Sequence, residues 1–203
     1  MRKPIFTSVE AQLVAFKENP KLVNLQLHQW RKNGDLVQLK RGLYAFKERE
    51  MKPANLAKSL YSPCYFSLDF ILSLAGIMAE AVFAYTLVTP KPTRCFETPY
   101  GNFYYHTIKK EAFTGYDPQT LMAEKEKALV DYFYLNSGKL KADNRFWEES
   151  RLEVVETEVN FKKVYQYAKL LHSTKLLFLL KHFEQYAKSH ETHRGRQKKE
   201  RRQ

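Results

Sequence analysis

The sequence is poor in cysteine and has no long apolar run. Its two cysteines, Cys64 and Cys95, lie 31 positions apart, a spacing that fits no metal-binding pair. Small secreted scaffolds depend on more disulfides than this. The longest apolar run near the C-terminus, residues 176–180, is too short to span a bilayer, and the N-terminal residues form no signal-peptide pattern. We therefore expect a soluble, cytoplasmic protein with no membrane partner.

Sequence motifs of catalysis are also missing. There is no Walker A loop, no G-x-G-x-x-G and no G-x-S-x-G. His190 and His193 have the spacing H-E-x-H, which does not place both rings on one helix face as H-E-x-x-H does. Glu124, Glu126 and Asp131 alternate with lysines, which predicts a solvated helix face, not a shielded acid–base pair. We expect no enzymatic activity, no cofactor and no metal.

Positive charge is concentrated at the two ends of the chain. The formal net charge of the 203 residues is +12. Residues 1–52 carry 11 Lys/Arg against 5 Asp/Glu, residues 53–150 carry 10 against 11, and residues 151–203 carry 13 against 6. A basic N-terminal region beside a neutral middle indicates a local contact with a polyanion.

The stretch from residue 20 to residue 46 carries the strongest functional pattern. It predicts a short helix, a tight corner, a second helix and a two-stranded hairpin. Asn19 can cap the first helix and Pro20 can open it, Asn24 can cap the second, and Gly34 can close it in a left-handed conformation. Residues 36–40 and 43–46 supply the two strands, with Gly42 at the turn.

Helical spacing divides the second helix into two sides. Val23, Leu27 and Trp30 fall on one side, which we expect to pack inward. The other side and the hairpin tip carry polar groups that suit DNA. The candidate DNA-binding residues are Gln26, His28, Gln29, Lys32, Lys40 and Arg41. Glutamine can bond the edge of an adenine, and the cations at the tip can contact phosphate or the minor groove, as in a winged helix-turn-helix.

A further helix precedes this stretch. Thr7 and Glu10 fit a capping box, and the helix is expected to continue to about Lys17. Its apolar stripe, Val9, Leu13 and Phe16, should pack against Leu27 and Trp30. Residues 1–50 would then form a winged helix-turn-helix domain.

The remainder predicts a larger mixed region that ends in helices. Helices are expected at residues 53–60, from residue 67, over 121–135, around 161–171 and from 174. Strands are expected at 81–89, 94–98 and 102–108. We place a second domain at residues 51–190 and a basic, disordered tail at 191–203. The predicted fold class is α+β.

Three stretches resemble the AbiEi antitoxins of bacterial AbiE (abortive infection) toxin–antitoxin systems. The first is LKRGLY at residues 39–44, the second is LYSPCYFSL at 60–68 running on to Gly76, and the third is EKALVD at 126–131. The hairpin sequence FETPYGNF at 96–103 is similar to one in that family. The stretches keep the family's order and spacing over roughly residues 5–190. One departure is Glu124-Lys125, where the family often has Thr-Pro before the third stretch.

The resemblance implies an N-terminal winged domain followed by an antitoxin domain. The first would bind inverted repeats in duplex DNA upstream of its own operon and repress transcription. The second would neutralise a cognate nucleotidyltransferase-like toxin as part of phage defence. The whole protein would be a monomer in solution or a dimer on DNA.

Two alternatives remain open from the residues alone. The aromatic residues Phe103, Tyr104 and Tyr105 together with the basic tail could bind RNA, although packing within a sheet is the simpler explanation for those aromatic residues. A metal-dependent nuclease would instead depend on Asp131 or a nearby glutamate.

Overall fold

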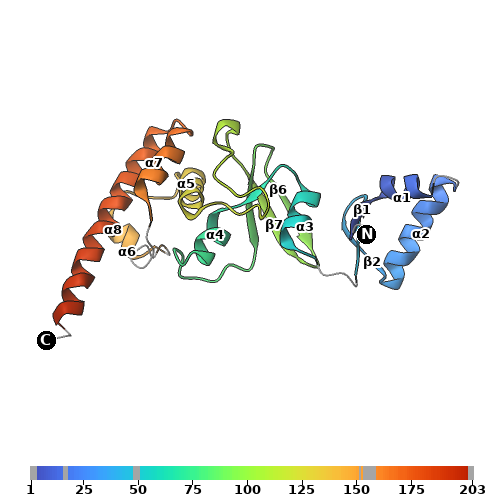
Figure 1. Cartoon of the computed structure of the whole chain (residues 1–203), viewed down its shortest axis with the longest axis horizontal. Coiled ribbons are helices and arrows are strands. Elements are labelled where there is room, and N and C mark those ends of the chain that lie inside the picture. Colours follow the sequence, from blue (N-terminus) through green and yellow to red (C-terminus); the bar gives the residue numbers. More distant parts are fainter. Residues whose placement is uncertain (1–3, 16–17, 48–50, 151, 153–158, 201–203) are drawn as a thin grey trace.

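The computed structural model describes residues 4–15, 18–47, 51–150, 152 and 159–200. Within those residues the chain forms eight α-helices and two small sheets, of three and four strands. The predicted α+β class is thereby confirmed. The molecule is elongated: an N-terminal module, a central sheet with its helices, and a C-terminal group of helices follow one another along it (Figure 1).

The N-terminal module combines two helices with a three-stranded sheet. Its elements are β1 (Ile5–Thr7), α1 (Ser8–Val14), α2 (Pro20–Asn33), β2 (Leu36–Lys40) and β3 (Leu43–Phe46). All pairings in the sheet are antiparallel, in the order β1-β3-β2. The hairpin was expected, but β1 was not, because three residues carry too little alternation to indicate a strand. Leu27, Leu36, Leu39 and Leu43 are buried in this module.

The ends of these helices have the capping residues that the sequence predicts. Thr7 caps α1, and the reciprocal bond from its backbone N–H to Glu10 measures 2.7 Å. The Asn19 side chain accepts a 2.9 Å bond from the backbone of Lys21 at the start of α2. Gly34 ends α2 with φ 86°, a left-handed conformation that glycine adopts cheaply.

The prediction of two short helices after residue 19 is wrong, because α2 is one continuous helix of 14 residues. Asn24 lies inside it and does not cap a second helix. Its side chain accepts a 3.1 Å hydrogen bond from Gln12 of α1. No glycine or proline interrupts the helix after Pro20, so the local preference of one asparagine for a cap is outweighed by propagation of the helix.

The expected packing of α1 is also wrong. Val9 is 61% exposed and Leu13 70%, and no residue of α1 is buried. Trp30 of α2 is 41% exposed, and Phe16 lies outside the described residues. Within residues 4–15 and 18–47, the two helices thus leave apolar surface exposed.

The central region is built on a four-stranded sheet. Its elements are α3 (Pro53–Leu60), β4 (Tyr65–Phe66), α4 (Leu68–Leu74), β5 (Tyr85–Thr89), β6 (Arg94–Thr98), β7 (Gly101–Thr107), the 3₁₀ turn η1 (Lys110–Ala112) and α5 (Lys125–Leu135). The strand order is β4-β5-β7-β6. The β6–β7 hairpin matches the prediction, whereas the parallel pairing of β5 with β7 was not foreseen. Phe103 and Tyr105 are fully buried, and the Tyr105 hydroxyl donates to the Ala57 carbonyl at 2.8 Å.

Three helices complete the C-terminal region: α6 (Asn144–Glu148), α7 (Phe161–Lys169) and α8 (Thr174–Glu200). Trp147 of α6 is buried, stacks on Phe133 and donates to Nδ1 of His182 at 2.9 Å. In the structure α8 continues to Glu200, into the stretch at 191–203 that the sequence analysis expects to be a basic tail, and residues 201–203 lie outside the described part. Lysine, arginine, glutamine and glutamate all favour helix, and no proline follows to stop it. No helix in the described ranges has both the length and the hydrophobicity to cross a membrane.

Candidate nucleic-acid interface

The exposed side of α2 forms the centre of the candidate interface. His28, Gln29 and Lys32 are all exposed, while Leu27 of the same helix is 1% exposed. This division follows from the helical repeat, which turns successive side chains by about 100°. The structure therefore brings these three predicted residues together on the outer side of the helix.

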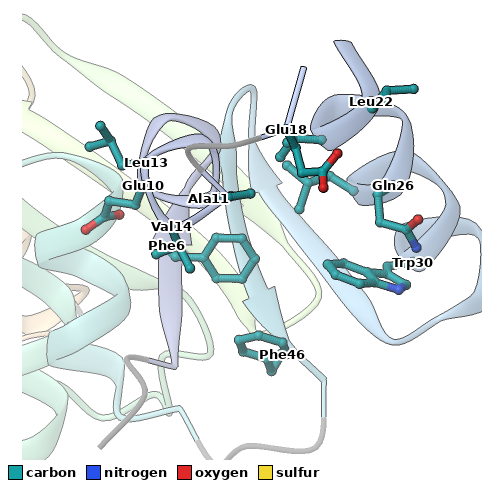
Figure 2. Close-up of a pocket in the computed structure, with 13 residues that line it drawn as sticks. Phe6, Glu10, Ala11, Leu13, Val14, Glu18, Leu22, Gln26, Trp30 and Phe46 are labelled. Carbon is teal, nitrogen blue, oxygen red and sulfur yellow. The ribbon is translucent and has the colours of Figure 1, made fainter. Parts of the chain in front are cut away.

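Gln26 has a different location. It lines the apolar groove between α1 and α2, beside Trp30 (Figure 2). Trp30 and Lys32 are two residues apart, which places them on about opposite sides of the helix. A base contact through Gln26 would need the groove side of α2 to face DNA, so the candidate for base recognition is Gln29.

The hairpin tip contributes one exposed cation. Arg41 sits in the turn between β2 and β3 and is exposed. Lys40 beside it is half-buried, since its ammonium donates to the Leu60 carbonyl at the end of α3 and lies 5.5 Å from the centre of the Phe96 ring. Burial and the nearby charge of Lys91 lower the pKa of Lys40. Lys40 therefore joins the module to the central region, and Arg41 is the group that extends outward.

Arg31 is part of the same surface and was missed by the sequence reasoning. Its guanidinium donates to Oε1 of Gln38 on β2 at 2.5 Å and lies 3.5 Å from Nδ1 of His28. This bridge joins α2 to β2 of the sheet. The only signal in the sequence was its place one turn after Leu27 and next to Lys32, which does not indicate a partner on another strand.

Charge is separated between two sides of the module. Three acidic residues lie within residues 4–47, and two of them, Glu10 and Glu18, line the groove. The exposed cations Lys32 and Arg41 are not among the groove residues. A polyanion is attracted to the second set and repelled by the first.

A second polar cluster lies deep in the central region and is not a solvated face. Lys127 and Asp131 of α5 are 1% and 0% exposed and form an ion pair. Oδ2 of Asp131 accepts hydrogen bonds from the Tyr65 hydroxyl at 2.9 Å and the Ser67 hydroxyl at 2.8 Å. Burial lowers the pKa of Lys127 and raises that of Asp131, while their mutual attraction opposes both changes. The prediction that this face of α5 is solvated is therefore wrong.

Glu126 departs from that prediction as well. It is 7% exposed and accepts a 3.2 Å bond from the backbone of Asn160, just before α7. Alternating Lys and Glu looks like a surface pattern, but here Glu126, Lys127 and Asp131 are buried, and Glu126 and Asp131 accept hydrogen bonds from distant segments. Ser67 illustrates the same point, since its hydroxyl bonds Asp131 and makes no cap bond to α4.

The polar atoms of this cluster bond one another, and Asp131 is fully buried. In the described ranges no three His, Cys, Asp or Glu side chains gather as metal ligands do.

Comparison of the chain with protein-family models found no match, and comparison with curated proteins found none either.

Proposed function

We propose that this protein is a sequence-specific DNA-binding repressor of its own operon and the antitoxin of a toxin–antitoxin pair. The observation that carries the DNA-binding half is the joint exposure of Gln29, Lys32 and Arg41 on a module in which Glu10 and Glu18 line a separate groove. In this proposal α1 and α2 are a helix-turn-helix, α2 is the recognition helix, and the β2–β3 hairpin is the wing.

The role of each group follows from its chemistry. Lys32 and Arg41 carry fixed positive charge and contact phosphates, which sets affinity. Gln29 offers a donor and an acceptor on one amide and reads a base edge, with adenine as the best match. His28 assists at the side of Lys32, and the bridge from Arg31 to Gln38 joins the helix to β2 of the wing.

The antitoxin half rests on the resemblance to AbiEi proteins. Two of the resembling stretches, SPCYFSL and EKALVD, meet in space through the bonds of Tyr65 and Ser67 to Asp131. This supports the resemblance because the two stretches, although their bonded residues are 64 and 66 positions apart in the sequence, contact each other in the fold. The central and C-terminal regions are the proposed antitoxin part, opposing a nucleotidyltransferase-like toxin.

The two alternatives have less support. Of the hairpin aromatic residues only Tyr104 is exposed, at 36%, so a stacking surface for RNA bases is not formed by Phe103 and Tyr105. Asp131, the carboxylate on which a nuclease was to depend, is fully buried and paired with Lys127.

A gel shift tests the proposal directly. The full chain is titrated onto a duplex from upstream of its own gene, with an unrelated duplex and a single-stranded RNA as competitors. We expect the upstream duplex to be retained in excess unrelated duplex and in RNA. Displacement by RNA, or equal binding of both duplexes, contradicts sequence-specific repression.

Co-expression tests the antitoxin half separately. The full chain and its Arg41→Ala variant are each expressed with the nucleotidyltransferase-like toxin encoded beside it. We expect both to restore growth, while only the unaltered chain represses a reporter driven by the upstream DNA. Loss of growth rescue in both would remove the antitoxin half and leave the repressor intact.

A further inference from the structure

Cations from distant segments gather where the tip of the hairpin meets the central region. The ammonium of Lys40, at the end of β2, lies 5.5 Å from the centre of the Phe96 ring on β6. The ammonium of Lys91, in the segment between β5 and β6, lies 5.3 Å from the centre of the Tyr61 ring. The centres of these two rings are 6.1 Å apart, so the two lysines converge on one aromatic pair just after α3.

Arg94 adds a third cation on the same side of the sheet. It pairs with Tyr105 across β6 and β7, and it lies two positions before Phe96 on β6. Side chains two positions apart on a strand lie on the same side of a sheet. The Tyr105 ring contacts the rings of both Tyr61 and Phe96, so Arg94 lies beside the aromatic pair. We call the three cations the joint cluster: Lys40, Lys91 and Arg94.

The joint cluster has no carboxylate counter-charge in the described part of the chain. The segments around it contain five Lys/Arg and one acidic residue; these segments are residues 36–44, 53–63 and 90–98. The acidic residue, Glu97, is next to Phe96 on β6 and therefore lies on the opposite side of the sheet. Burial and the charge of Lys91 lower the pKa of Lys40. Positive charge is thus in excess here, and an anion would neutralise it.

Both lysines of the cluster keep N–H donors for such an anion. Lys40 donates to the Leu60 carbonyl, and Lys91 donates to the Ser62 carbonyl. An ammonium has three N–H donors, so each lysine has donors beyond the one that its carbonyl uses. Because the carbonyls already hold the two side chains in place, less side-chain freedom is lost when an anion binds.

The neighbouring wing indicates which anion fits. Arg41, the proposed phosphate contact of the wing, directly follows Lys40, and consecutive Cα atoms are about 3.8 Å apart. The cluster therefore continues the proposed DNA-facing surface onto the central region. The rings of Tyr61 and Phe96 are half-buried and carry the lysine ammoniums, so they suit the stacking of unpaired bases poorly. Charge of this kind fits the phosphate backbone of a duplex.

We propose that the joint cluster binds the phosphate backbone of the duplex that the wing contacts, so that the central region takes part in holding DNA. Lys91 and Arg94, which are both exposed, make the contact, and Lys40 positions the wing beside them. The contact does not depend on base sequence, because phosphates carry no base information. The inference rests on the proposed DNA binding and extends it to the region assigned to the antitoxin.

Fluorescence anisotropy of the full chain on the upstream duplex, over a salt series, measures this contact. The variants are Arg94→Ala and Lys91→Ala/Arg94→Ala. Lys175→Ala/Lys181→Ala on α8 is the matched control, because it removes the same charge from two exposed lysines. We expect the double cluster variant to lower the slope of log affinity against log salt by about two, the single variant by about one, and the control not at all. An unrelated duplex should show the same reductions.

The length of the duplex gives a second measurement, which uses the unaltered chain. The upstream duplex is shortened stepwise from each end. Once the end beyond the wing is removed, the slope for the unaltered chain should fall by about two. The slope for Lys91→Ala/Arg94→Ala should not fall at that end, because the contact is already lost. Circular dichroism confirms that each variant is folded.

Arg41→Ala separates this inference from the proposed function. If Arg41→Ala lowers the salt slope and Lys91→Ala/Arg94→Ala does not, the wing binds DNA and the joint cluster does not. An equal loss in Lys175→Ala/Lys181→Ala overturns the inference in favour of general electrostatics. A cluster variant that loses single-stranded RNA but not duplex assigns the cluster to RNA and also overturns it. An unaltered chain that binds no duplex contradicts both the inference and the proposed function.

Discussion

The Tyr65 hydroxyl donates a 2.9 Å hydrogen bond to Oδ2 of Asp131, joining β4 to α5 across 66 positions of sequence. Ser67 donates to the same oxygen, and Lys127 pairs with the other oxygen of the carboxylate. The four side chains of Tyr65, Ser67, Lys127 and Asp131 satisfy one another's hydrogen bonds. The free-energy cost of burying the two charges is offset only while all four side chains are present.

Asp131→Asn should therefore destabilise the protein strongly, by about 3–5 kcal/mol, because Lys127 is left buried without its counter-charge. Urea denaturation followed by circular dichroism measures the loss. Glu124→Gln is the matched control, since Glu124 pairs with Lys163 at a half-exposed site and should lose far less. The double variant Lys127→Met/Asp131→Leu should recover only part of the stability, since no unpaired charge remains but the hydroxyls of Tyr65 and Ser67 lose their acceptor. Equal losses in Asp131→Asn and Glu124→Gln would contradict a stabilising network.

Arg41→Ala and Lys32→Ala should each weaken binding to every duplex, specific or not. Each removes one proposed phosphate contact, which lowers the slope of log affinity against log salt by about one. Fluorescence anisotropy over a salt series measures both quantities. Lys141→Ala is the control for net charge, because Lys141 is an exposed lysine outside the module. A slope that changes equally in all three variants would argue for general electrostatics and against this interface.

Gln29→Ala should relax specificity at a single base pair and leave unspecific binding unchanged. The loss of discrimination should be about 1–3 kcal/mol, the value of one bidentate base contact. Gln26→Ala is the natural comparison, because Gln26 lines the groove and should alter nothing. A panel of duplexes, each with one substituted base pair, measures the pattern. If Gln26→Ala relaxes specificity and Gln29→Ala does not, the groove side of α2 faces the DNA.

The stability contributed by Glu184 should be lost in acid. Burial would raise the pKa of this carboxyl, but hydrogen bonds from Lys188 at 2.6 Å and Tyr165 at 2.5 Å outweigh it and hold the pKa below the ordinary 4.5. Since the folded-state pKa is the lower one, the contribution is complete above pH 4.5 and declines as the pH falls through the folded-state pKa. It should be about 0.2–1 kcal/mol, because Lys188 is largely exposed.

Comparing the unaltered chain with Glu184→Gln in urea at pH 7 and at pH 3 measures that contribution. The difference in midpoint should be clear at pH 7 and smaller at pH 3. A difference that is as large at pH 3 as at pH 7 would show that the variant acts through packing and not through the carboxylate charge.

The features that could be predicted from sequence are those set by a few neighbouring residues. Thr7 with Glu10, Asn19 with Pro20, and Gly34 each satisfy backbone groups within three positions, and the structure has all three. The extent of α3 and the β6–β7 hairpin follow from the same kind of local rule.

The features that could not be predicted depend on which distant segments meet. Asn24 was interpreted as a cap, although its partner Gln12 lies on another helix. Lys127 and Asp131 looked like surface charges until Tyr65 and Ser67 were placed beside them. The parallel contact of β5 and β7 likewise requires knowing that β6 lies on the far side of β7.

The contact of Lys40 with the Leu60 carbonyl has a mechanical consequence. It ties the tip of the hairpin to the end of α3, so we expect the hairpin and the central region to move together while that bond holds. A force applied at the tip, where Arg41 extends, is transmitted to α3 and not absorbed by the connecting segment. Without the ammonium, as in Lys40→Met, we expect the N-terminal module to move more freely relative to the central region.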